Sequence, residues 1–212
     1  MSCCAPPPGV EIFDEKVARR DARRYRRKGL ARPARRLVEM VAGTGADVLE
    51  IGGGVGDVAI ELLKRGARRA TNIELSPAYE PFAAELLRET GLADRVERRR
   101  GDIVEDPTAI EAADVVVMHR VVCCYPDMPG LVGAAAEKAR RLLALSYPRD
   151  AWWMRLGVRA ENLWWRLAGH DFRSYVHRPR EIAAVARSRG LRPVREHRGF
   201  FWELVAFERA QA

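Results

Sequence analysis

Residues 48–57 read Val-Leu-Glu-Ile-Gly-Gly-Gly-Val-Gly-Asp, and this stretch decides the fold class. It begins as a short apolar strand, reaches an acid near its end and runs into four glycines; a helical pattern follows from Asp57 to Lys64. Glycines permit a tight turn and let a ligand lie against bare backbone. The helix start behind them offers free N–H groups and the positive end of a dipole. The stretch therefore predicts a ligand-binding turn between a strand and a helix.

The spacing of this turn differs from that of two common nucleotide-binding turns. A dinucleotide loop of the form G-x-G-x-x-G/A, counted from Gly52, needs a small residue where Asp57 stands. A phosphate-binding P-loop needs a lysine after the glycines, and none is present there. On this stretch alone, an ordinary glycine-rich strand–helix turn stays open as the alternative.

Two further acids follow predicted strands. Glu74 comes in the strand 70–75 and lies 22 residues after Gly52. This is close to the roughly 20 residues expected for a carboxylate that accepts the ribose hydroxyl protons. Asp102 follows the strand 95–100. Either acid alone fits a solvated turn, but three acids in order, each at or after a strand, favour a site for a nucleoside.

The pattern Glu50-x-Gly52-x-Gly54-x-Gly56 resembles motif I of the class I S-adenosylmethionine (SAM)-dependent methyltransferases. The resemblance implies SAM as cofactor, with Glu50 near its methionine amino group and Asp102 near its adenine amino group. It also implies a Rossmann-like α/β fold: a seven-stranded sheet, parallel except for one antiparallel strand in a C-terminal hairpin, with helices on both faces. The residues expected at the cofactor are Glu50, Gly52, Gly53, Gly54, Gly56, Glu74, Leu75, Asp102, Ile103 and His119.

Strands and helices alternate along the middle of the chain, which predicts a parallel sheet. The predicted strands are 47–51, 70–75, 95–100, 114–118 and 142–146, and the predicted helices are 14–28, 33–41, 57–65, 77–90, a short one near 107–112, 129–141 and 179–190. Only Arg198 and Gly199 separate the last two predicted strands, 191–197 and 200–208, so these should form an antiparallel hairpin.

The chain divides into a terminal segment and a core. Residues 1–35 are expected to be an extended arm and a strongly basic helix that caps the substrate, and residues 36–212 to be the methyltransferase core. Residues 147–178 form a lid-like insertion, with Asp150 as the predicted cap of an amphipathic helix that ends at Gly169. Trp153 and Trp164 share its apolar face. That face either packs on the core, covers an apolar substrate or docks on a membrane surface.

Candidate chemistry lies after the fourth strand, where acceptors bind in open α/β sheets. His119 is the first candidate for a general base or a substrate orienter, and a histidine bonded to backbone is the alternative. Arg120 could hold a carboxylate or phosphate, or lie on the surface, and Tyr125 could line the acceptor pocket or merely pack. The (D/N)-P-P-Y signature and an acidic metal set are both missing, which disfavours DNA amino methylation and catechol methylation.

Four cysteines come as two adjacent pairs, Cys3-Cys4 and Cys123-Cys124. They lack the spacing of a zinc site, and no metal is predicted. The two pairs could meet to bind a soft metal or metalloid. The alternative is a pair of small buried side chains at 123–124 and a loose arm at 3–4.

Two C-terminal stretches resemble magnesium-protoporphyrin O-methyltransferases: Leu-Ala-Leu-Ser-Tyr-Pro at 143–148 and Arg-Ser-Tyr-Val-His-Arg-Pro-Arg-Glu-Ile at 173–182. That family esterifies a porphyrin propionate, and a carboxylate nucleophile needs no base. With such an acceptor, His119 would only orient the substrate. Taken together, the catalytic candidates are His119, Tyr125 and His177, and the substrate candidates are Arg120, Tyr25, Trp153 and Tyr175.

Charge and composition bound the function. The 212 residues carry a net charge of +8, which permits an anionic substrate or nucleic acid. The chain lacks an apolar run of 18 residues and a signal-peptide layout, so a cytoplasmic protein is expected. The leading prediction is a SAM-dependent methyltransferase of a small, aromatic or carboxylate-bearing molecule. An RNA methyltransferase and a thiol-based metal or redox sensor are the alternatives.

Overall fold

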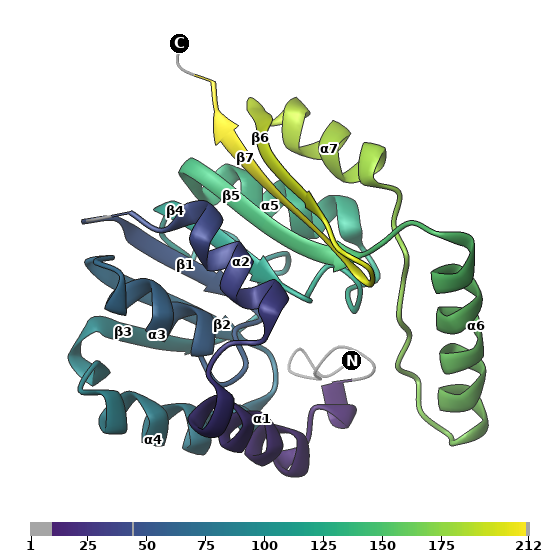
Figure 1. Ribbon diagram of the computed structural model, residues 1–212, viewed down its shortest axis with the longest axis horizontal. Coiled ribbons are helices and arrows are strands. Elements are labelled where there is room, and N and C mark those ends of the chain that lie inside the picture. Colours follow the sequence, from purple (N-terminus) through teal and green to yellow (C-terminus); the bar gives the residue numbers. More distant parts are fainter. Residues whose placement is uncertain (1–9, 44, 211–212) are drawn as a thin grey trace.

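The structure, a computed structural model, describes residues 10–43 and 45–210. Its centre is a seven-stranded sheet in the order β3-β2-β1-β4-β5-β7-β6 (Figure 1). The strands are β1 (Asp47–Ile51), β2 (Arg69–Glu74), β3 (Val96–Arg100), β4 (Ala113–His119), β5 (Ala139–Pro148), β6 (Leu191–Arg198) and β7 (Trp202–Arg209). The first five strands pair in parallel, and β7 is antiparallel to both β5 and β6. The predicted sheet with its single antiparallel strand is confirmed.

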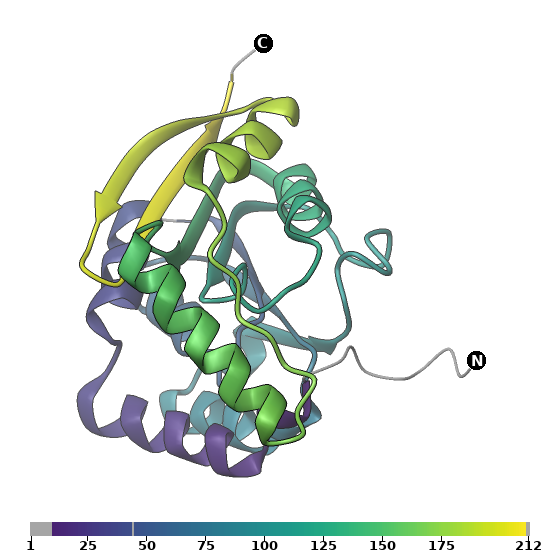
Figure 2. The same cartoon turned by 90° about the vertical axis from the view of Figure 1, so that its right-hand side faces the viewer.

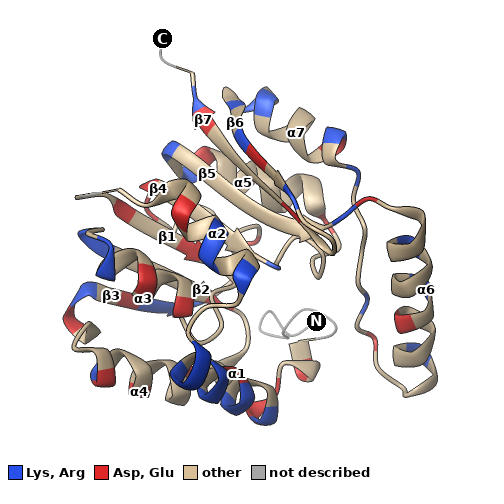
Figure 3. Cartoon of the chain, viewed as in Figure 1, with Lys and Arg blue, Asp and Glu red and all other residues tan. Residues whose placement is uncertain are grey.

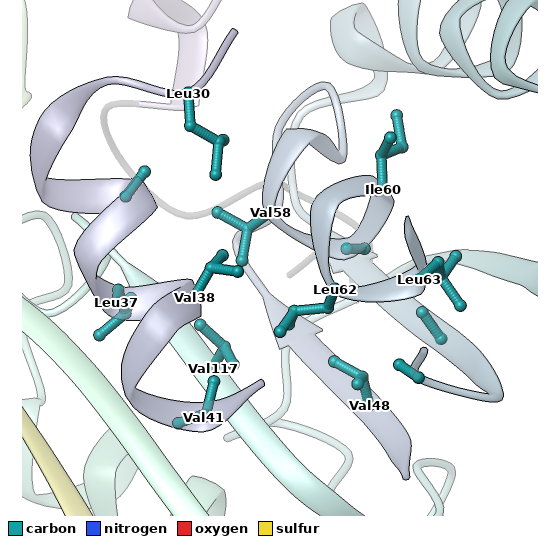
Figure 4. Close-up of a cluster of buried hydrophobic side chains, with 14 of the residues drawn as sticks. Leu30, Leu37, Val38, Val41, Val48, Val58, Ile60, Leu62, Leu63 and Val117 are labelled. Atoms are coloured by element: carbon teal, nitrogen blue, oxygen red, sulfur yellow. The ribbon is translucent and has the colours of Figure 1, made fainter. Parts of the chain in front are cut away.

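Helices cover both faces of the sheet. They are α1 (Glu15–Lys28), α2 (Arg32–Val41), α3 (Asp57–Lys64), α4 (Glu80–Thr90), α5 (Met128–Lys138), α6 (Trp152–Leu167) and α7 (Pro179–Ser188), with short 3-10 turns η1 (Val10–Ile12), η2 (Pro77–Tyr79) and η3 (Ala93–Arg95). Successive residues of a strand point to opposite faces, so the core divides in two. Val48 and Val117 pack against α2 and α3 (Figure 4). Leu49 and Val116 join the cluster formed with α5 and α7.

The N-terminal basic helix is α1, and its inner face is fixed to the core. The carboxylate of Asp14 accepts a hydrogen bond from the Val17 N–H at 2.9 Å and so caps the helix. Ala18 and Ala22 are buried, and the helix lies against η2 and α4. The Ser76 hydroxyl donates to the Phe13 carbonyl at 2.6 Å, which joins the segment before α1 to the end of β2. Cys3 and Cys4 lie outside the described residues.

Two predicted helices differ from the structure. Residues 107–112 form turns instead of a short helix, because the Asp106 carboxylate accepts hydrogen bonds from the Thr108 hydroxyl and the Ala109 N–H and closes the chain locally. Helix α5 ends at Lys138, three residues before the predicted end. Ala139 already pairs with Ala113 of β4, so sheet pairing takes residues whose composition favours a helix.

The insertion forms helix α6, but its start and its orientation differ from prediction. Asp150 does not cap it, because its carboxylate accepts from the Arg155 guanidinium at 2.7 Å, and the helix begins at Trp152 without a side-chain cap. No residue of α6 is buried, so its apolar face does not pack on the core. Figure 1 shows α6 standing clear of the sheet, and Figure 2 shows the same helix from its outer side. Within the described residues, none of the helices has both the length and the apolar character to cross a bilayer.

Candidate functional site

The glycine turn is held against the neighbouring strand with no room for side chains. The N–H groups of Gly52 and Gly53 both donate to the Ile73 carbonyl of β2, at 2.8 and 3.2 Å. Gly52 has a φ of +63°, and a Cβ there would lie 2.6 Å from a methyl carbon of Val121. A Cβ on Gly53 would overlap the side-chain amide of Asn72. The turn therefore presents bare backbone at the carboxyl ends of the strands, which suits a ligand that lies close to the chain.

Glu74 is fixed at the end of β2 by two backbone donors. Its Oε2 accepts from the Gly54 N–H at 2.7 Å, and its Oε1 accepts from the Ser76 N–H at 2.9 Å. Each carboxylate oxygen has capacity for a second hydrogen bond, and the residue is only half-buried. The Glu74 carboxylate is therefore a fixed pair of hydrogen-bond acceptors beside the glycine turn. Two vicinal hydroxyls, which donate one hydrogen bond each, could bind to it.

Glu50 lies deeper than the other two acids. It is 2% exposed, and its Oε2 accepts from the Asn72 amide at 2.7 Å and from the Ala59 N–H at 3.2 Å. Burial raises the pKa of its carboxyl to about 8, with the nearby charge of Asp57 adding to the rise. Glu50 thus joins β1, β2 and α3 as a largely neutral acid at pH 7. Its predicted proximity to an amino group stays a prediction.

Asp102 and Tyr125 form one hydrogen-bonded unit. The Tyr125 hydroxyl donates to Oδ2 of Asp102 at 2.8 Å, while Oδ1 accepts from the Val104 N–H at 2.8 Å. Burial and this bond raise the pKa of Tyr125. The contact places Tyr125 beside the third acid, at the side of the site where the cofactor is expected. Of their neighbours, Ile103 is buried and Leu75 is half-buried.

The protonation of His119 is set by Ser146 on the adjacent strand. Ser146 is fully buried, and its hydroxyl has two partners: the Arg120 N–H at 2.9 Å and Nδ1 of His119 at 2.8 Å. The amide can only donate, and among the described residues Nδ1 is the one acceptor within reach of the buried hydroxyl, so the arrangement that satisfies both groups directs the hydroxyl hydrogen to Nδ1. His119 then carries its proton on Nε2. Burial, with the charges of Arg120 and Arg24, lowers its pKa to about 3, so the ring is neutral near pH 7.

Arg120 follows β4 in an uncommon backbone conformation. Its φ of +62° is the only positive value at a non-glycine residue in the described part of the chain. The guanidinium lies over the ring of Trp202 at 4.9 Å, and the same ring lies 6.4 Å from His119. Residues in this region of φ are enriched at functional sites. The result is a cation, an imidazole and an indole grouped at one edge of the sheet.

The segment before α7 brings Tyr175 and His177 to the same edge. The Tyr175 N–H donates to the Cys123 carbonyl at 2.8 Å, and its ring stacks on His177 with centroids 5.6 Å apart. Burial lowers the pKa of His177, although a hydrogen bond with the Val122 backbone opposes this. Among the described residues, the buried Nε2 of His177 has no hydrogen-bond partner.

The adjacent cysteines lie at this edge as well. The two Sγ atoms are 3.4 Å apart, and both approach the Arg120 carbonyl. Their mutual hydrogen bond raises the pKa of Cys123 and lowers that of Cys124. Within the residues that the structure describes, no three His, Cys, Asp or Glu side chains gather as a metal site.

Two predicted substrate residues have partners within the protein. Tyr25 is 6% exposed, and its hydroxyl donates to Glu61 of α3 at 2.8 Å, so it joins α1 to α3. Trp153 stacks on Phe200 of the β6–β7 turn, with ring centroids 4.9 Å apart. The structure therefore buries Tyr25 and ties Trp153 to the tip of the hairpin, and their role towards a substrate stays a prediction.

Four site residues were missed by the sequence analysis: Asn72, Arg98, Ser146 and Trp202. Arg98 has a side chain only 7% exposed, and it donates to the Gly54 carbonyl at 3.1 Å. A signal was present for three of them, because Asn72, Arg98 and Ser146 are polar residues inside predicted strands. Trp202 gave none, since an aromatic residue in a strand is ordinary.

Comparisons with known proteins agree with this geometry. A family described as a methyltransferase domain matches residues 22–196. No curated protein matches the chain.

Among solved structures, magnesium protoporphyrin IX methyltransferase from Synechocystis PCC 6803, with bound S-adenosylhomocysteine (SAH), has a TM-score of 0.64 at 17% identity and covers 95% of this chain and 86% of its own. A putative methyltransferase in complex with the Haloferax volcanii Trm112 activator has a TM-score of 0.73 at 14% identity, covering 96% and 98%. Geranyl diphosphate C-methyltransferase from Streptomyces coelicolor A3(2) has a TM-score of 0.66 at 15% identity, covering 84% and 77%. At these identities, the likeness is one of fold.

The raised pKa of Glu50 predicts how the free energy of unfolding changes with pH. Its folded-state pKa of about 8 lies above the ordinary value of 4.5, so the native state holds the proton more tightly. The stabilisation is complete below pH 4.5 and is lost as pH rises towards and through 8. Glu50→Gln keeps an acceptor but cannot ionise. The free energy of unfolding, measured by urea titration at pH 5, 6, 7 and 8, should fall less steeply with pH in this variant than in the wild type.

The matched control is Glu97→Gln, the same change at an exposed strand position. It should keep the wild-type slope with pH. Equal slopes for wild type and Glu50→Gln would show that the buried carboxyl does not titrate abnormally.

Proposed function

The chain belongs to the methyltransferase domain family, and we propose that it transfers the methyl group of SAM to a carboxylate oxygen of a small molecule with a flat apolar body. The proposal has a donor half, at the ends of β1 to β3, and an acceptor half, at the ends of β4 and β5. The single observation that carries the acceptor half is the buried Ser146 hydroxyl, which makes His119 a neutral hydrogen-bond donor.

The residues on the donor side fit a sulfonium nucleoside. The glycine turn presents bare backbone that an aminoacyl chain can approach closely, and Glu74 offers two fixed oxygens to a ribose diol. Asp102, held by Tyr125, offers acceptor capacity to an exocyclic amine. When bound, SAM supplies an electrophilic methyl group. The protein then has to align the acceptor with it and exclude water, because the reaction is an in-line displacement.

His119 suits an acceptor that has no proton to lose. A general base needs a free lone pair and a pKa near the working pH. His119 has its lone pair on Nδ1 engaged by Ser146, and its pKa is about 3. Its Nε2–H can instead donate to an oxygen and orient it. A carboxylate accepts such a bond and is already ionised at pH 7.

The other residues of this edge suit the rest of such a molecule. The Arg120 guanidinium can pair with a second carboxylate, while Trp202 holds it in place through a cation–π contact. The stacked rings of Tyr175 and His177 offer an aromatic wall. A porphyrin with propionate groups has this combination of flat ring and carboxylates. The likeness in fold to magnesium protoporphyrin IX methyltransferase supports the same class of acceptor.

The test is methyl transfer from isotope-labelled SAM to a panel of acceptors. The panel contains a metalloporphyrin with free propionates, the same porphyrin with both propionates esterified, a simple phenol and total RNA. We expect label in the free-acid porphyrin alone, as an ester that mild base releases as labelled methanol. Label in the esterified porphyrin or the phenol would contradict the carboxylate assignment.

RNA is the second candidate because of α1. Eight cationic residues of this helix are exposed: Lys16, Arg19, Arg20, Arg23, Arg24, Arg26, Arg27 and Lys28 (Figure 3). Such a face binds phosphate backbones without reading sequence. Base-stable label in RNA, with affinity that falls steeply as salt rises, would replace the small-molecule proposal with this one.

Glu74→Gln tests the donor half by itself. The amide keeps one acceptor oxygen but loses the charge, so the affinity for SAH should weaken by about 1–3 kcal/mol. Isothermal titration calorimetry measures this without any acceptor. The exposed variant Glu97→Gln should bind SAH as the wild type does. If Glu74→Gln keeps wild-type affinity, Glu74 does not hold the ribose.

Ser146→Ala tests the state of His119 without any acceptor. In the wild type, nitrogen-15 NMR of labelled histidine should show His119 neutral from pH 5 to pH 8, with its proton on Nε2. Removing the hydroxyl frees Nδ1, so the variant should show a mixture of tautomers. Ser188→Ala, an exposed serine on α7, should leave the His119 signals unchanged. A wild-type His119 that becomes charged near pH 6, or that carries its proton on Nδ1, would contradict the role of donor.

A further inference from the structure

Exposed apolar side chains are concentrated in one region. Among residues 10–43 and 45–210, eight large hydrophobic side chains are exposed. One of them, Val194, lies on β6; the other seven are Trp152, Leu156, Leu163, Trp164 and Leu167 of α6, and Phe200 and Phe201 of the β6–β7 turn. Large contiguous apolar patches are rare on soluble monomers and mark interaction surfaces. We call these seven residues the outer apolar face.

This face results from a firmly held helix. On the inner side of α6, the Asn162 side chain donates to the Ser174 carbonyl and accepts from the Ser174 N–H, both at 2.8 Å. Trp165 meets Phe172 edge to face with centroids 5.7 Å apart. With the stacking of Trp153 on Phe200, these contacts fix which side of the helix points outwards. Because these contacts hold the opposite side of the helix against the protein, Trp152 and Leu167 face outwards and are 78% and 79% exposed.

The outer apolar face has the pattern of a helix that lies in a membrane interface. Trp152, Leu156, Leu163 and Leu167 follow each other at helical spacing and form one stripe. Each residue turns the helix by about 100°, which puts the exposed Arg159 and Arg166 along one border of this stripe. Arginines in that position reach the phosphate level while aromatic and leucine side chains enter the acyl boundary.

Helix α1 adds charge at the same end of the molecule. Figure 1 shows α1 and the C-terminal end of α6 at the same end of the molecule, with the start of α1 turned towards α6. The segment before α1 contacts the segment after α6. The ring of Phe13 lies 5.7 Å, between centroids, from that of Phe172, which also contacts Trp165 of α6. The exposed cations of α1 named above thus lie at the same end of the molecule as the C-terminal end of the apolar helix (Figure 3). A basic surface next to an apolar one is complementary to anionic lipid.

We propose that the outer apolar face docks on an anionic phospholipid bilayer, with α1 attracted to its headgroups. A second copy of the chain is the competing occupant of such a face. A symmetric dimer would bring together two chains of net charge +8. An anionic bilayer neutralises these charges instead. The inference uses no residue of the donor half, so it stands or fails independently of the proposed reaction.

The experiment is co-sedimentation of the full chain with vesicles of phosphatidylglycerol and phosphatidylcholine, or of phosphatidylcholine alone. The wild type should bind the anionic vesicles, more weakly as salt rises. A variant with Trp152→Ser, Leu156→Ser, Leu163→Ser and Leu167→Ser should bind at least about tenfold more weakly, because the apolar area is lost. Val194→Ser, the exposed apolar residue outside the patch, is the matched control and should bind like the wild type. SAH affinity of the fourfold variant, unchanged from wild type, establishes that it is folded.

A second measurement does not depend on the fourfold variant. Brominated acyl chains quench tryptophans that reach the acyl boundary, so wild-type fluorescence should fall on vesicles that contain them. The conservative variant Trp152→Phe should lose part of this quenching. Light scattering on the free protein tests the competing occupant. Failure of the wild type to bind anionic vesicles would overturn the proposal, and a dimer that the four substitutions dissociate would assign the face to a second copy.

Discussion

A buried carboxyl group at the end of β1 determines the geometry on which the candidate site depends. Glu50 is hydrogen-bonded to Asn72 of β2 and to the backbone of α3, so one side chain joins two strands to the helix behind the turn. The glycine backbone crosses directly over Asn72, and this contact leaves the turn little freedom. Glu74 is then aimed by the N–H of Gly54 in the same turn. Burial raises the pKa of the Glu50 carboxyl, whereas Glu74 and Asp102 at the strand ends are only half-buried.

The acceptor side is organised by a different constraint, the register between two parallel strands. His119 is opposite Ser146 in the pairing of β4 with β5, so the hydroxyl reaches the imidazole without any loop having to position it. The same hydroxyl binds the N–H of Arg120, whose left-handed backbone turns the chain out of the strand. One buried serine thereby fixes a tautomer and a change of direction together. The two sides of the site are built independently, one from a turn and one from a sheet.

Much of this arrangement could be predicted from the sequence, because it follows from local rules. The alternation of strands and helices, the hairpin after Gly190 and the positions of Glu74 and Asp102 after their strands depend on periodicity and spacing alone. The errors arose where side-chain contacts or strand pairing decided between local alternatives. Sheet pairing ended α5 early, which is a contact distant in sequence. Arg155 engaged Asp150 five residues away, and Asp106 closed turns with Thr108 and Ala109, so these two errors have local causes. The orientation of α6 depends on Asn162 and Trp165 meeting the 170–178 segment, and helical periodicity cannot indicate which side has partners.

The antiparallel direction of β7 has a consequence for how such a protein can diversify. Because β7 runs against its neighbour β5, the tip of the last hairpin emerges on the edge where the parallel strands end. Trp202, at the start of β7, therefore meets Arg120 and His119, although more than eighty positions separate them along the chain. Insertions or substitutions at that tip would leave every strand pairing intact. Substitutions in the β6–β7 turn could thus change which acceptor fits beside His119, while the glycine turn and the acids of the donor half stay the same.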